Sequence, residues 1–263
     1  LMKTTLFFPL FIFSLFFISC STSDDKSTKT NNEFKEATKL PDTTDTTQRD
    51  LKKYFPNDDI QSITSITQNG TSLNTEYFSF EPNTIIAKNQ NGLIKEKTII
   101  NESTIIIESY DKNGTKIEGQ DKNAQRYITE GDLVLDLQVE NYRFTCSFVN
   151  THGSFLISSL EGLSNINTRY KDVLEFECII RTTQTFNGTS EILNHSAKQH
   201  VFMANGLGII ADQTQLCYNN QTITIDNNTT TYKVAQHNAP SCQSNKINYN
   251  YIDTVEKEFR PFG

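Results

Sequence analysis

Residues 133–148, LVLDLQVENYRFTCSF, alternate apolar and polar side chains with a period of two. The apolar positions are Leu133, Leu135, Leu137 and Val139 in the first half, and Tyr142, Phe144, Cys146 and Phe148 in the second. An extended strand turns successive side chains to opposite faces, so this period indicates β-strands with one buried face. The parity changes at Asn141, which predicts a bulge or a turn there.

The same period continues on both sides of this stretch. Residues 174–180 place Leu174, Phe176, Cys178 and Ile180 on one face, and residues 247–251 read as a last strand. Asn-Gly pairs at 69–70, 91–92, 113–114 and 187–188 lie between runs rich in Ile, Thr, Tyr and Phe, where they favour tight hairpins with two positive φ values. No long window has an apolar stripe of period 3.6. The sequence therefore predicts an all-β fold with few helices: a curved antiparallel sheet, either a half-barrel or a sandwich-like meander.

The domain organisation follows from length and composition. We expect a signal peptide at 1–19, a tether at 20–50 and a β body at 51–263, with a subdivision near 120–130 as an option. The chain of 263 residues has 24 Lys+Arg against 31 Asp+Glu and a net charge of −7. A net-acidic chain with no basic block is a poor match for a phosphate backbone, so no nucleic acid is expected as a partner. At the start of the body, Asp50 is predicted to cap a short helical turn that Pro56 ends.

The amino-terminal residues have the features of an export signal. Lys3 precedes an almost wholly apolar run, Leu6 to Ile18, which is too short for a membrane span of about 20 residues. The run ends Phe17-Ile18-Ser19-Cys20, which resembles the lipobox of bacterial lipoproteins. The resemblance implies that Cys20 is acylated and becomes the first residue of an anchored chain. Because one acyl chain binds a bilayer only marginally, two or three chains would make release negligible.

The segment after Cys20 is predicted to be a flexible tether, because its Ser, Thr, Asn, Asp and Lys residues bury too little apolar surface to fold. Its start, with Ser21, Ser23 and the acidic pair Asp24-Asp25, is similar to the leader of Bacteroidetes lipoproteins. That similarity implies the outer membrane as the location, on either the periplasmic or the surface side. The membrane, reached through the lipid, is thus an expected partner.

A second resemblance lies in residues 170–213. The run Tyr170 to Phe176, followed by Val201-Phe202-Met203-Ala204-Asn205-Gly206-Leu207-Gly208-Ile209-Ile210, resembles β domains of bacterial envelope lipoproteins that have no established chemistry. It implies a curved antiparallel sheet. Two glycines spaced by two lie on one face of a strand, where they allow either a sharp bend or the approach of another backbone or a ligand. Phe202, Gly206 and Gly208 are therefore the candidate ligand-facing residues.

Four cysteines remain when Cys20 is set aside, and an even number in an exported protein favours disulfides. Four cysteines allow three pairings. Cys217 and Cys242, which flank a 24-residue stretch, are the favoured pair; Cys146 and Cys178 either form a second disulfide or pack as reduced apolar residues.

The sequence contains no recognisable catalytic, cofactor or metal motif. It lacks C-x-x-C, H-E-x-x-H, G-x-S-x-G and phosphate-binding glycine patterns, so no metal, cofactor or enzymatic activity is predicted. His152-Gly153-Ser154 is interpreted as a turn. Glu175 and Glu177 share a strand face and are interpreted as exposed.

Two functions remain for such a chain. The first is an anchored, non-enzymatic binding protein for a hydrophobic, glycan or peptide ligand. The alternative is a structural or interaction lipoprotein that contacts another envelope protein. A pocket with two facing carboxyl groups of raised pKa would instead favour a hydrolase.

Overall fold

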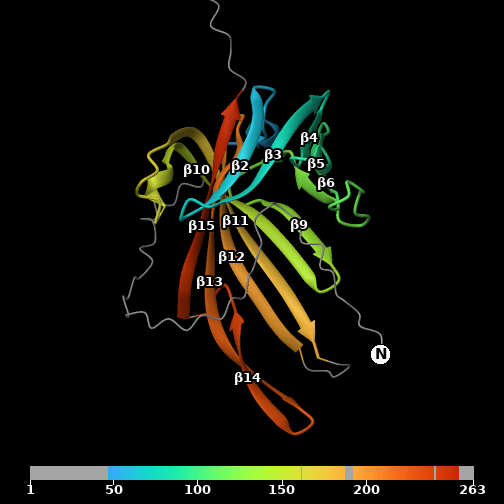
Figure 1. The fold of residues 1–263 in the computed structure, drawn as a ribbon, viewed down its shortest axis with the longest axis vertical. Coiled ribbons are helices and arrows are strands. Elements are labelled where there is room, and N and C mark those ends of the chain that lie inside the picture. The colour runs from blue at the N-terminus through green and yellow to red at the C-terminus, as the bar shows by residue number, and fades with distance from the viewer. Residues whose placement is uncertain (1–46, 161, 187–191, 240, 255–263) are drawn as a thin grey trace, which may run out of the picture.

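The computed structural model describes residues 47–160, 162–186, 192–239 and 241–254, and most of them form β-strands (Figure 1). The strands are β1 (Arg49–Asp50), β2 (Ile60–Thr67), β3 (Ser72–Glu81), β4 (Thr84–Lys88), β5 (Ile94–Ile100), β6 (Thr104–Ser109), β7 (Lys122–Gln125), β8 (Tyr127–Ile128), β9 (Leu133–Val139), β10 (Tyr142–Leu156), β11 (Arg169–Thr185), β12 (Ile192–Ala204), β13 (Gly208–Ile225), β14 (Asn228–Ala235) and β15 (Ser241–Thr254). Two 3₁₀ turns, η1 (Leu51–Tyr54) and η2 (Ile157–Ser159), are the helical elements of this part of the chain. The prediction of an all-β fold is confirmed.

The main sheet is antiparallel and closes on itself. Its strand order is β12-β11-β10-β9-β7-β6-β5-β4-β3-β2-β15-β13-β14, and an additional pairing of β12 with β13 completes a twelve-stranded barrel that leaves β14 outside the ring. The predicted curved antiparallel sheet is thus confirmed, but it closes completely and does not stop at a half-barrel or a sandwich-like meander. Strands on both sides of residues 120–130 belong to the same ring. The seam between β7 and β9 has a single residue pair, Ala124 with Leu135.

The ring has two unlike walls. One wall consists of β10, β11, β12 and β13, which are 15, 17, 13 and 18 residues long. The other contains β4, β5, β6 and β7, which are 5, 7, 6 and 4 residues long. In Figure 1 the long strands follow the long axis of the molecule, and the hairpin of β13 and β14 projects beyond the ring at its lower end. We call these the long wall and the short wall.

The hairpin turns use glycine, as predicted, but with a different geometry. Gly70 connects β2 to β3 and Gly92 connects β4 to β5, each with positive φ, whereas the preceding asparagines do not have positive φ. The amide of Gly92 donates to the Asn89 carbonyl, and the Asn89 side chain accepts from the amides of Asn91 and Leu93. The expected turn has two residues with positive φ. This turn has one, the glycine, and it is stabilised by hydrogen bonds to the Asn89 side chain. Asn187-Gly188 lies outside the described residues.

The parity change near Asn141 is a turn. Val139 at the end of β9 pairs with Tyr142 at the start of β10, and Glu140 has a φ of 45°. Leu135, Leu137, Phe144, Cys146 and Phe148 are buried inside the ring as the pattern predicts. Leu133, by contrast, is 47% exposed, because the register shifts near Cys146.

The segment before β2 lies against one end of the ring. Asp50 caps η1 by accepting a hydrogen bond from the Lys52 amide, which confirms the predicted cap. The Leu51 amide donates to the Arg126 carbonyl, and the Gly206 amide donates to the Lys53 carbonyl. This segment therefore joins both walls of the ring.

The protein has a hydrophobic core on each face of the long wall. The inner core contains Phe144, Phe148, Phe176 and their neighbours. The outer core contains Phe155 and Phe202, together with residues of the segment that follows β10. Among the described residues, no helix combines the length and apolarity that a membrane crossing requires.

Candidate functional site

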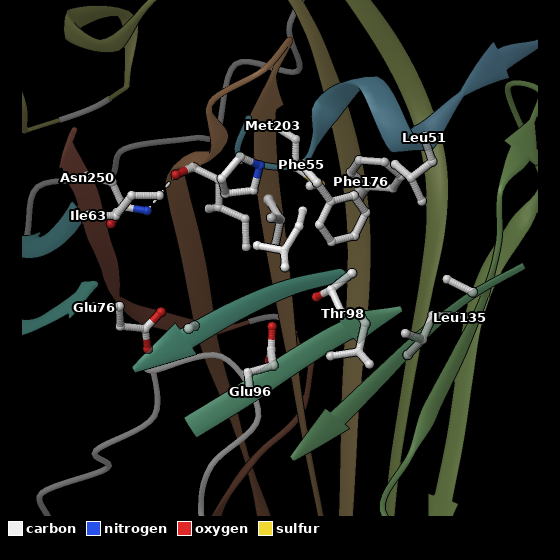
Figure 2. Close-up of a pocket in the computed structure, with 18 of the residues that line it drawn as sticks. Leu51, Phe55, Ile63, Glu76, Glu96, Thr98, Leu135, Phe176, Met203 and Asn250 are labelled. Atoms are coloured by element: carbon white, nitrogen blue, oxygen red, sulfur yellow. Dashed lines mark hydrogen bonds between the residues drawn. The ribbon is translucent and has the colours of Figure 1, made fainter. Parts of the chain in front are cut away.

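The ring encloses a cavity of about 160 Å³, which is the candidate functional site. Figure 2 shows the residues around it, contributed by both walls and by the segment before β2. Apolar side chains form most of its surface, while polar groups come from β2, β3, β5 and β15. The cavity is therefore one hollow with two chemically distinct sides.

The apolar side belongs mainly to the long wall. Phe176 on β11 and Met203 on β12 line the cavity, with Leu135 on β9 and Phe55 after η1. These positions follow from the period of two, because Phe176 alternates with the outward-facing Glu175 and Glu177. Contacts with this side are therefore hydrophobic.

The polar side belongs to the short wall and to the neighbouring strand β3. Glu76 on β3 and both Lys95 and Glu96 on β5 line the cavity, together with the buried Thr98. The Lys95 ammonium donates to Oε1 of Glu76 over 2.7 Å, and Asn74 Nδ2 donates to the same oxygen over 3.2 Å. In Figure 2 Glu76, Glu96 and Thr98 lie across the hollow from Phe176 and Met203.

A second lysine supports this side from behind the lining. The Lys122 side chain on β7 is fully buried, and its Nζ lies 3.6 Å from Oε2 of Glu96. Burial raises the pKa of Glu96, and the nearby Glu76 raises it further, whereas Lys122 and Lys95 oppose this shift. Burial lowers the pKa of Lys122, which the Glu96 charge partly offsets. Glu96 and Lys122 therefore each favour the charged form of the other, against the effect of burial.

The predicted ligand-facing Phe202 does not line this cavity. It lies on the opposite face of β12 from Val201 and Met203, which do line it. Its ring stacks on Phe155 at a centroid distance of 4.5 Å within the outer core. The prediction for Phe202 is corrected accordingly: its contacts are structural.

Gly206 and Gly208 permit the approach of another backbone, one of the roles considered for them. Gly206 lies in the turn between β12 and β13, so the two glycines do not share one strand face; both have positive φ, 74° and 81°. A Cβ at Gly208 would lie 3.0 Å from Cγ of Pro56, and one at Gly206 would lie 3.0 Å from Nδ2 of Asn57. Gly208 also lines the cavity. Because Pro56 packs closely against it, Gly208 fixes the position of the segment before β2, which bounds the hollow.

The four cysteines of the body form two disulfides in the structure, Cys146–Cys178 and Cys217–Cys242. Each joins residues that are directly paired on neighbouring strands. Cys146 and Cys178 also line the cavity. Cys20, the predicted lipidation site, lies outside the described residues.

A second polar cluster lies on the outer face of the long wall. His152 lies in β10, not in the predicted turn, and its Nε2 is 2.7 Å from Oε2 of Glu175. His200 Nδ1 lies 2.8 Å from Oε1 of the same carboxylate. Burial alone would raise the pKa of Glu175, but the two histidine hydrogen bonds outweigh it and lower that pKa to about 2. Among the described residues, no group of three or more His, Cys, Asp or Glu side chains could hold a metal ion.

Asp212 is a further buried carboxyl, between β12, β13 and β15. It is 1% exposed and accepts a hydrogen bond from Gln199 Nε2 over 2.9 Å. Burial raises its pKa to about 7, although hydrogen bonds from Gln199 and Asn248 act in the opposite direction. This carboxyl therefore titrates near neutral pH, but it does not line the cavity.

The sequence did not identify the charged side of the cavity. The charged residues of this side lie in strands whose sequence is typical of a solvated face. Closure of the ring turns their side chains inward; they are Glu76, Lys95, Glu96 and Lys122. An ion pair between β3 and β5 would have required knowledge of the long-range pairing.

The chain was compared with models of protein families, with curated proteins and with solved structures, and nothing matched in any of the three comparisons.

Proposed function

We propose that this chain is a non-enzymatic binding protein of the bacterial cell envelope that holds a small hydrophobic molecule inside its closed sheet. The supporting observation is the cavity of about 160 Å³ between an apolar wall and a wall with a few polar groups. Ligand sites are typically concave, mostly apolar and supplied with few polar groups. The small volume favours a hydrophobic ligand over the glycan and peptide alternatives.

The proposed location depends on the amino terminus. Acyl chains on Cys20 would anchor the body at the outer membrane through the tether, on the periplasmic or the surface side. Palmitate labelling in cells should mark the wild-type chain and not Cys20→Ala. An unlabelled wild-type chain would contradict the anchor without affecting the binding proposal.

Filling the cavity tests the binding proposal. Ala124 on β7 lines the hollow, so Ala124→Leu should occupy it. Native mass spectrometry of the chain purified from membranes should detect a co-purifying small molecule that Ala124→Leu loses. Ala235→Leu, in the hairpin outside the ring, is the matched control and should retain it. A wild-type chain that never carries a ligand and binds no apolar probe would contradict the proposal.

The alternative is an interaction protein, and the β13–β14 hairpin favours it. β14 is the end strand of the described sheet, and its Thr230 and Thr231 are exposed. An open strand edge can pair with a strand of another protein. Crosslinking in cells from positions on β14 should then capture one partner reproducibly. Capture equal to that from a distant exposed position such as Glu118 would exclude this role.

A hydrolase is the remaining option, because Glu96, whose pKa is raised, lines the cavity beside Glu76. Hydrolysis of a glycoside requires a pair of carboxyl groups, one protonated and one ionised. Lys95 holds Glu76 at 2.7 Å, and the hollow is too small for a sugar together with its leaving group. Binding is therefore the better-supported function. Glycosidase activity that is lost in Glu96→Gln would reverse this order.

A further inference from the structure

The polar side of the cavity has balanced charges when Lys122, behind its lining, is counted with the lining residues. Glu76 and Glu96 contribute two carboxylates, and Lys95 and Lys122 contribute two ammonium groups. A ligand with a net charge would leave one charge without a partner in a mostly apolar cavity, which is costly. This balance favours a neutral ligand.

The arrangement of these groups favours a ligand that donates a hydrogen bond. Lys122 contacts Oε2 of Glu96 from outside the lining, while the Glu96 side chain itself reaches the cavity. Thr98, two residues along the same strand, adds a hydroxyl. Lys122, 3.6 Å from Glu96, favours the ionised form of this carboxyl against the effect of burial. An ionised carboxylate accepts hydrogen bonds and donates none, so the complementary group is an O–H or N–H.

The volume limits the size of the ligand. A buried apolar cavity of about 150 Å³ accommodates benzene. The cavity of about 160 Å³ is close to this value, and Phe176, Met203 and Leu135 offer an apolar surface to a ring of this size. Figure 2 shows Phe176 and Met203 across the hollow from Glu96 and Thr98, and Leu135 at its edge.

We propose that the cavity binds a small neutral alcohol, with an apolar body about the size of one aromatic ring and a hydroxyl that donates to the Glu96 carboxylate. The body contacts Phe176 and Met203. This inference rests on the proposed binding function and names its ligand class.

Four probes that share one ring test the assignment: toluene, benzyl alcohol, benzylammonium and benzoate. Calorimetry on the whole chain should show benzyl alcohol binding about tenfold more tightly than toluene, because a hydrogen bond to a charged group adds this much affinity. Both ions should bind more weakly than the alcohol. Equal affinity for toluene and benzyl alcohol would overturn the hydroxyl assignment and leave the cavity function intact. Tightest binding of either ion would overturn the neutral class, and binding of none would contradict the proposed function as well.

Two variants locate the acceptor. Glu96→Gln should reduce the preference for benzyl alcohol over toluene to about threefold or less, because the hydrogen bond then lacks a charged partner. Glu108→Gln is the matched control and should keep the full preference. Glu108 lies on the outer face of β6, the strand next to β5, where it pairs with Lys116. If Glu96→Gln does not fold, the double variant with Lys122→Met removes both buried charges and serves the same purpose. An unchanged preference in either Glu96 variant would overturn the assignment.

Discussion

The two walls of the ring differ in length, crosslinking and chemistry. The long wall has strands of 13–18 residues, hydrophobic cores on both faces and the Cys146–Cys178 disulfide. The short wall has strands of 4–7 residues and holds Glu96 at the cavity with the buried Lys122 behind it. The comparison indicates that the long wall supplies most of the stability, so the short wall can carry groups that are costly to bury.

Truncation of a core side chain should give the largest effect on stability. Phe148 on the long wall is 1% exposed, so Phe148→Ala should lower the free energy of unfolding by about 3–5 kcal/mol. Phe78 on β3 borders the existing hollow, so Phe78→Ala should cost less, about 1–2 kcal/mol. Urea denaturation measures both. Equal losses would break the contrast between the long wall and the strands on the other side of the cavity.

Removal of the inner disulfide should follow in size. Replacing both Cys146 and Cys178 with Ala should lower stability by about 2–4 kcal/mol, because the bond closes a loop of 32 residues in the unfolded chain. Thermal unfolding with and without reductant provides the measurement. A loss within error of zero would show that strand pairing alone holds the long wall together.

The Glu175 cluster predicts a smaller effect that depends on pH. The folded pKa of about 2 lies below the ordinary value of 4.5, so the carboxylate stabilises the fold above pH 4.5, and this contribution is lost as the pH falls towards 2. It amounts to about 1–3 kcal/mol. Glu175→Gln should flatten the fall in stability across this range. The same acid-induced slope in Glu175→Gln would assign it to other groups.

Replacement of the buried pair on the short wall should have the smallest effect. Changing Glu96 to Gln and Lys122 to Met together should leave stability within about 1 kcal/mol or raise it, because desolvation offsets much of the attraction within a buried ion pair. Lys122→Met alone leaves Glu96 without its partner and should be less stable than the double variant at pH 8. A double variant that loses several kcal/mol would show that this pair, too, stabilises the ring.

The sequence predicted the faces of strands only where one face is buried. Leu174, Phe176 and Cys178 alternate with more exposed residues, so their inward direction was correct. Residues 201–204 are buried on both faces of β12, and a period of two then cannot tell the cavity from the outer core. Phe202 was therefore assigned to the wrong face.

Long-range pairing explains the other differences. Closure of the ring depends on β15 pairing with β2, about 190 residues earlier in the chain, and local patterns do not encode such a contact. The inward positions of Glu96 on β5 and Lys122 on β7 were missed for the same reason, because they depend on closure of the ring. The cap at Asp50 and the positions of the glycine turns, which depend on nearby residues alone, were predicted correctly, whereas the two positive φ values expected in each turn were not found.

The central claim is that the two walls enclose a hollow that accepts a small apolar molecule. Crystals of the mature chain under xenon pressure test it most directly, because xenon enters dry apolar cavities of this size. We predict xenon density between Phe176 and Met203 on one side and Thr98 on the other. Side chains packed across this space, with no xenon inside the ring, would contradict the account.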